Sequence, residues 1–151
     1  MQSLSVRNEQ QMKQYPNIDY GSELQARALD SIKTGHCLEA SIIIFQLLEI
    51  FLRIAIRGFG AGSGVCDSTL TKCAEEENSF YRLTLYLDLI LPANEISEEL
   101  RDLSKERNRI MHKLFFEFNE VSSLNEALKA FCLKGVNLHN KIILLLGENE
   151  H

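Results

Sequence analysis

Residues 36–58 read HCLEASIIIFQLLEIFLRIAIRG, and this stretch decides how the rest of the chain folds. From residue 38 to residue 56 it is apolar around most of a helical circumference, as in a helix that is buried on nearly every side. Its polar residues lie seven, three, four and four positions apart: Glu39, Gln46, Glu49, Arg53 and Arg57. These steps place them in one narrow stripe, with Glu49 and Arg53 at pairing distance. We therefore predict a central bundle helix over 38–56 with a supporting polar stripe of Gln46, Glu49 and Arg53.

A membrane span is the alternative interpretation of such an apolar run. Two charges at its centre, Glu49 and Arg53, would be costly in lipid, so a buried helix is favoured and no membrane partner is expected. The first 17 residues are polar and contain no apolar segment typical of a secretory signal. The sequence therefore predicts a cytoplasmic protein.

Helical spacing of apolar residues continues on both sides of this central segment. The further predicted helices cover 22–34, 68–91 with a break near Asn78-Ser79, 95–117 and 123–146. Gly58 is expected to end the central helix, and the glycine-rich residues 58–64 to form a flexible loop. No segment alternates apolar and polar residues as a half-buried strand would. The prediction is an all-α, four- to five-helix up-down bundle.

Length and composition set the domain organisation. A chain of 151 residues that is 45% hydrophobic and contains 2 Pro is expected to form one globular domain. We place this domain at 22–147, between a polar N-terminal arm at 1–21 and a short tail at 148–151. The net charge of -5 excludes a protein that coats nucleic acid through a global positive field, so any bound nucleic acid must be held locally.

The four cysteines have neither C-x-x-C spacing nor a matching pair of histidines. A structural zinc site is therefore not predicted, and reduced, mostly buried thiols are expected instead. Nothing in the sequence indicates a metal or another cofactor.

The predicted helix over 95–117 carries an arginine in an unusual place. Its apolar residues are four, three, seven and four positions apart: Ile96, Leu100, Leu103, Ile110 and Leu114. Arg107 occupies the position that this pattern skips. Because an unpaired charge on an inward face is costly, Arg107 must either find a partner or open onto a cleft.

Asn108 and His112 are four residues apart and therefore lie above one another beside Arg107. A guanidinium can hold two phosphate oxygens, and an imidazole can exchange a proton near neutral pH, while an amide can orient either group. These three residues are the candidate catalytic site. If a nucleic acid is bound here, further basic residues on this helix would contact its phosphates: Arg101, Lys105 and Arg109.

A purely structural interpretation stays open at this point. Arg107 would then form an ion pair with Glu49 of the central helix, and His112 would simply be exposed.

The Arg107-Asn108 pair followed by His112, within a helical bundle, resembles the HEPN family, whose R-x-x-x-x-H element often has Asn after the Arg. The central apolar helix with Glu49 is similar to the second helix of that family. The resemblance implies a metal-independent endoribonuclease that cleaves single-stranded RNA through attack of the 2′-hydroxyl. It also implies a homodimer that brings two copies of the element into one cleft, in a toxin or defence system.

One residue departs from the family pattern. Toxins of this family that pair with a nucleotidyltransferase antitoxin usually have Tyr two residues after the His, where this chain has Leu114. An antitoxin partner of that type is thus less well supported. Many members of the family are not catalytic, so the alternative function is a non-catalytic helical interaction or regulatory module.

Other chemically active residues are given structural interpretations. His36 and His139 are expected at the surface or at helix ends, because neither has a second ligand one turn away. Tyr81 and Tyr86 could stack on bases of single-stranded RNA, but packing in the core is favoured for both.

Overall fold

The chain folds into helices. The computed structural model describes residues 18–113, 116 and 120–148, and this part of the chain contains no β-strand. Its helices are α2 (Ile18–Lys33), α3 (Cys37–Gly62), α4 (Asp67–Thr71), α5 (Phe80–Ile90), α6 (Ile96–Lys113) and α7 (Val121–Glu148). A π-helical turn, Lys72–Glu76, continues α4. The predicted all-α class is confirmed, but the described residues form six α-helices where four to five were predicted. The break predicted near Asn78-Ser79 separates the π-helical turn from α5.

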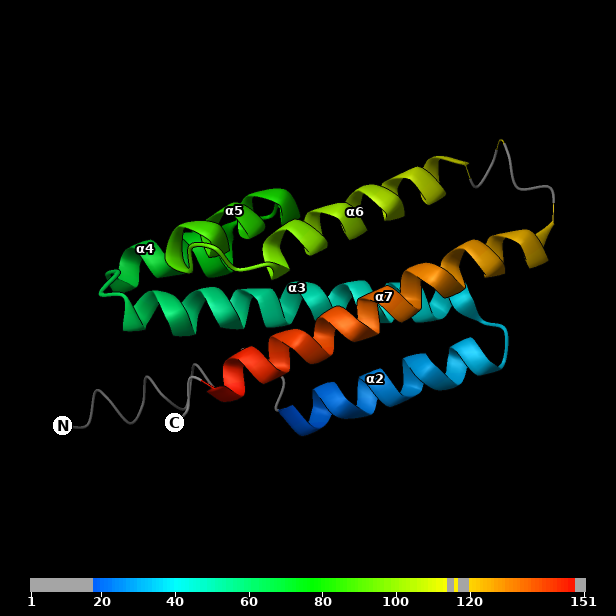
Figure 1. Cartoon of the computed structure of the whole chain (residues 1–151), viewed down its shortest axis with the longest axis horizontal. Helices are drawn as coiled ribbons and strands as arrows, with labels where there is room; N and C mark the ends of the chain where they lie inside the picture. The colour runs from blue at the N-terminus through cyan, green and yellow to red at the C-terminus, as the bar shows by residue number, and fades with distance from the viewer. Residues whose placement is uncertain (1–17, 114–115, 117–119, 149–151) are drawn as a thin grey trace.

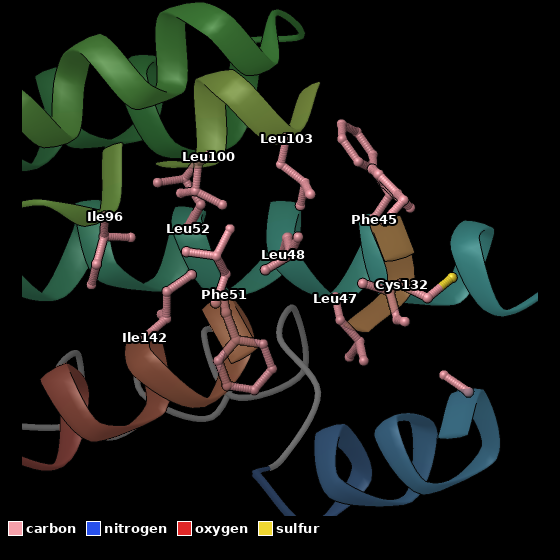
Figure 2. Packing of buried hydrophobic residues seen from close by; sticks show 14 of the residues in the cluster. Phe45, Leu47, Leu48, Phe51, Leu52, Ile96, Leu100, Leu103, Cys132 and Ile142 are labelled. Carbon is pink, nitrogen blue, oxygen red and sulfur yellow. The ribbon is translucent and has the colours of Figure 1, made fainter. Parts of the chain in front are cut away.

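The most apolar helix, α3, lies at the centre of the bundle, as predicted. α2, α5 and α7 pack directly against it, and α6 bridges α5 and α7 (Figure 1). Figure 2 shows Leu48 and Leu52 of α3 beneath Leu100 and Leu103 of α6. All four side chains are buried. Because burial of one such side chain contributes about 1.5–3 kcal/mol, this layer is a main source of stability.

Two glycines allow neighbouring helices to approach α3 closely. The prediction that Gly58 ends the central helix is wrong, because α3 continues to Gly62 and includes much of the expected loop. At Gly60 an added Cβ would lie 2.3 Å from Leu70, and at Gly135 of α7 it would lie 2.4 Å from Ile44. Gly60 therefore makes room for α4 instead of ending the helix.

The other helix boundaries differ from the predicted ones by a few residues. α2 begins at Ile18, so the end of the predicted polar arm is helical, and residues 1–17 lie outside the described residues. α7 covers Val121–Glu148 where 123–146 was predicted. α6 is described to Lys113, and residues 114, 115 and 117–119 of the region after it lie outside the described part.

A side-chain cap explains where α6 begins. The Asn94 Oδ1 atom accepts a hydrogen bond from the backbone N–H of Ser97 at 2.8 Å. This bond satisfies one of the backbone donors that every helix N-terminus leaves free. Glu98 and Glu99 in the first turn add favourable interactions with the helix dipole.

Within the described part of the chain, no helix combines the length and the apolarity that crossing a bilayer requires.

Candidate functional site

The candidate catalytic residues lie on the C-terminal half of α6. Ile96, Leu100, Leu103 and Ile110 are buried, which confirms the inward stripe predicted for this helix. Arg107 lies in the gap of that stripe and is partly buried. The side chain of Leu114, the last predicted member of the stripe, lies outside the described residues.

The Arg107 guanidinium lies on an aromatic ring. Its central carbon is 4.0 Å from the centroid of the Phe45 ring, which belongs to α3. The Phe45 ring in turn packs on Phe80, the first residue of α5, with 4.7 Å between the ring centroids and 36° between the ring planes. A cation at this distance from an aromatic face is attracted by the negative potential of the ring. Residues of three helices are therefore joined through the Phe45 ring.

The predicted alternative, an ion pair between Arg107 and Glu49, is wrong. Glu49 accepts a hydrogen bond from Arg53 at 3.2 Å, as the i, i+4 spacing predicted. Among the described residues, no oxygen accepts a hydrogen bond from Arg107 and no carboxylate pairs with it. Its N–H donors therefore remain available to a ligand.

Asn108 and His112 are both exposed and face the same hollow. This shallow surface pocket is lined by Asn108, Met111 and His112. The prediction that the two polar residues share one face of the helix is thus confirmed. Arg107 directly precedes Asn108 but does not line this hollow, so the guanidinium lies on a face of α6 that adjoins the face of the amide and the imidazole.

The three basic residues predicted to contact RNA fall into two groups. Arg101 donates hydrogen bonds to Asp88 Oδ2 at 2.7 Å and to Thr84 Oγ1 at 3.3 Å, so its guanidinium joins α6 to α5. Lys105 and Arg109 are exposed, and neither forms an ion pair within the described part of the chain. These two residues, and not Arg101, have cations that are free to meet a phosphate.

The polar stripe of α3 supports a different part of the fold. Arg53 donates to the carbonyl oxygens of Ala74 at 2.9 Å and Glu77 at 2.7 Å, in addition to its bond with Glu49. It therefore anchors the π-helical turn to α3. Gln46, the third predicted member of the stripe, is exposed.

The prediction that His139 lies at the surface is wrong, whereas His36 is exposed as predicted. His139 is 1% exposed, and its ring meets the Phe51 ring edge-on with 4.6 Å between centroids. Its Nδ1 accepts a hydrogen bond from Gln25 of α2 at 2.9 Å, while Nε2 is buried without a partner. Burial lowers the pKa of His139, because desolvation disfavours the charged imidazolium. One feature of the sequence could have predicted this burial: His139 lies three residues before the apolar Ile142 in the predicted helix over 123–146.

Tyr86 and Tyr81 also differ from each other in burial. Tyr86 packs against the core and donates a hydrogen bond to Glu77 Oε2 at 3.0 Å, and this bond is the main cause that raises the pKa of Tyr86. Packing in the core is thus confirmed for Tyr86. It is wrong for Tyr81, which is exposed at the start of α5.

All four cysteines are free, as predicted, but the prediction that most of them are buried is wrong, because two are not. Cys37 and Cys132 are buried, whereas Cys66 is exposed, and hydrogen bonds from Ser68 and Thr69 lower the pKa of its thiol to about 7. Within the described residues, no group of three or more histidine, cysteine, aspartate or glutamate side chains is placed to hold a metal ion.

Phe45 is the residue of the site that sequence reasoning missed. It is one of many apolar residues in α3, and nothing in its spacing sets it apart. Only the packing of α5 and α6 on α3 shows that its ring faces a cation.

Compared with family models, with curated proteins and with solved structures, the chain matches none of them. The resemblance to the HEPN family therefore rests on the Arg107–His112 element and on the order of the helices.

Proposed function

We propose that this protein is a HEPN-like, metal-independent endoribonuclease that cleaves single-stranded RNA with Arg107, Asn108 and His112. One observation carries the proposal. The guanidinium of Arg107 is partly buried on an aromatic ring without an acceptor among the described residues, next to a hollow lined by Asn108 and His112. A partly buried cation with free donors is suited to bind an anion such as a phosphodiester.

The proposed reaction is an internal transfer within the RNA. The 2′-oxygen attacks the adjacent phosphorus, a P–O2′ bond forms, and the P–O5′ bond breaks to leave a 2′,3′-cyclic phosphate and a 5′-hydroxyl. His112 takes the proton from the 2′-hydroxyl as general base. Arg107 binds the non-bridging oxygens and stabilises the charge that develops on the phosphorane. Asn108 orients the phosphate or the imidazole through its amide.

Proton balance favours a homodimer in this proposal. One proton leaves the 2′-hydroxyl while another must reach the departing 5′-oxygen. Two copies of the Arg107–His112 element in one cleft would supply an imidazole for each transfer. The placement in a toxin or defence system, and an antitoxin partner, remain predictions from the resemblance.

The test is cleavage of a labelled single-stranded RNA by the full chain in the presence of a chelator. We expect cleavage that leaves cyclic phosphate ends, and a loss of at least about 100-fold in rate for H112A, as for removal of a general acid or base. The matched control is H36A, because His36 is also exposed but lies at the start of α3. An inactive wild-type protein, or equal rates for H112A and H36A, would contradict the proposal.

A second candidate, the non-catalytic interaction module, is favoured by a different surface. Tyr81, Leu85 and Leu89 of α5 are exposed at i, i+4 and i+8, so they form an apolar stripe along one face of this helix. A well-folded wild-type protein without activity on RNA would favour this function over the first.

A further inference from the structure

We infer that Phe45 is a positioning residue for Arg107, which holds the guanidinium over its ring so that every N–H donor stays free for a phosphate. This inference rests on the proposed function, because it assigns a role to a residue that supports the same site. Phe45 itself is 9% exposed and carries no group that could take part in the chemistry.

The Phe45 ring is itself held in place. It packs on Phe80 with 4.7 Å between the ring centroids, and Phe80 is the residue at which α5 begins. Figure 2 shows the Phe45 side chain extending from α3 toward the side on which Leu103 and α6 lie. The ring is thus fixed between two helices, and the guanidinium reaches it from a third.

The way in which a guanidinium is held decides what it can still bind. A carboxylate or carbonyl partner consumes N–H donors, as Glu49, Ala74 and Glu77 do for Arg53. An aromatic face attracts the cation through its quadrupole and accepts none of the in-plane N–H groups. Arg107 is therefore held at a defined place, and none of its N–H groups is taken by an acceptor among the described residues.

This arrangement is a form of preorganisation. An arginine side chain in water samples many rotamers, and each must be lost when the transition state forms. A guanidinium already resting on a ring has lost part of that freedom before the substrate arrives. The Phe45 ring should therefore increase kcat more than it improves KM.

The first arm of the test measures RNA cleavage by ring variants at position 45. F45L removes the aromatic face, and we expect kcat to fall about 10-fold while KM rises by a smaller factor of about three, from the usual strength of a partly desolvated cation–π contact. F45Y keeps the face and should restore kcat to within about twofold of the wild type. If F45L does not fold, F45M provides the same comparison, because methionine fills the volume without a ring.

The matched control is F51L. Phe51 is a fully buried ring of the same helix that packs on His139 and lies away from Arg107. It should lower the melting temperature at least as much as F45L but leave kcat unchanged. Equal losses of kcat in F45L and F51L, or a failure of F45Y to restore it, would overturn the positioning role.

The second arm separates the failure of this inference from that of the proposed function. A fluorescent single-stranded DNA lacks the 2′-hydroxyl, so it can be bound without being cleaved, and its anisotropy reports binding through Arg107. If the wild type binds this DNA but cleaves no RNA, and F45L binds several-fold more weakly than F45Y, the positioning role stands and the endoribonuclease proposal fails. If F45L and F45Y bind and cleave alike, only the positioning role fails. A wild type that neither binds nor cleaves overturns both.

Discussion

Arg53 lies in the polar stripe of α3 and Arg107 in the gap of the apolar stripe of α6, and the groups that surround the two guanidinium ions differ. The Arg53 side chain is 16% exposed and donates hydrogen bonds to Glu49 and to two backbone carbonyls. The Arg107 guanidinium lies on the Phe45 ring, and no described residue accepts a hydrogen bond from it. The difference shows that a partly buried arginine is structural where its donors are matched, and available to a ligand where an aromatic ring replaces the acceptors.

The other arginines follow the same division. Those with an ion pair in the described part of the chain are Arg27, Arg53, Arg57, Arg82 and Arg101. Within the same part of the chain, Arg107 and Arg109, which lie within the Arg107–His112 element, have no ion pair. In a protein with a net charge of -5, we predict that an anion would bind at these two guanidinium groups.

The largest effect should come from removing the free guanidinium. We expect R107A to lower the rate of RNA cleavage about 100- to 1,000-fold, as for loss of one donor that stabilises transition-state charge. Single-turnover cleavage of a labelled oligonucleotide measures this effect. R101A is the control, because Arg101 is bound to Asp88 and Thr84. A rate for R107A within about threefold of that for R101A would remove the distinction between the two kinds of arginine.

Removal of the Arg53 side chain should lower stability more than removal of the Arg107 side chain. R53A leaves two backbone carbonyls and a carboxylate without their donor, so we expect the free energy of unfolding to fall by about 2–4 kcal/mol. R107A loses only a cation–π contact, and its cost should be below about 1 kcal/mol. Urea unfolding followed by circular dichroism compares the two variants. Equal losses of stability would show that Arg107 is as structural as Arg53.

A smaller effect on stability is expected from His139, through its protonation at low pH. The His139 ring is buried, its Nε2 atom has no hydrogen-bond partner among the described residues, and burial lowers the pKa of His139 in the folded protein. The unfolded chain therefore binds a proton first as the pH falls through the usual value of 6.5, and stability is lost from there down to the folded pKa. His139 adds at most about 1.4 kcal/mol per pH unit to the slope of the free energy of unfolding against pH. This contribution should disappear in H139Q and persist in H36Q when unfolding is measured between pH 7 and pH 5.

Much of the fold followed from periodicity. The apolar circumference of α3 and the inward stripe of α6 predicted which residues are buried, because burial of a helix face requires a repeat of three or four residues. The same repeat placed Glu49 beside Arg53 and identified Arg107 as an anomaly. These conclusions needed only the geometry of one helix at a time.

Two of the failures depend on contacts between helices. Gly58 was taken as a helix end, but α3 continues and the glycine at position 60 makes room for Leu70 of α4. His139 was expected at the surface, but it packs on Phe51 and binds Gln25. In each case the deciding neighbour is distant in sequence, and no local pattern encodes it.

The sequence alone determined that a helical bundle would carry an arginine, an asparagine and a histidine on one helix, because side-chain spacing and helix geometry are local properties. The tertiary structure decided what Arg107 meets. Glu49 is held by Arg53, and the start of α5 fixes Phe45 beneath the guanidinium. Which group faces a charge depends on how three helices pack, and packing is set by the shapes of all their side chains together.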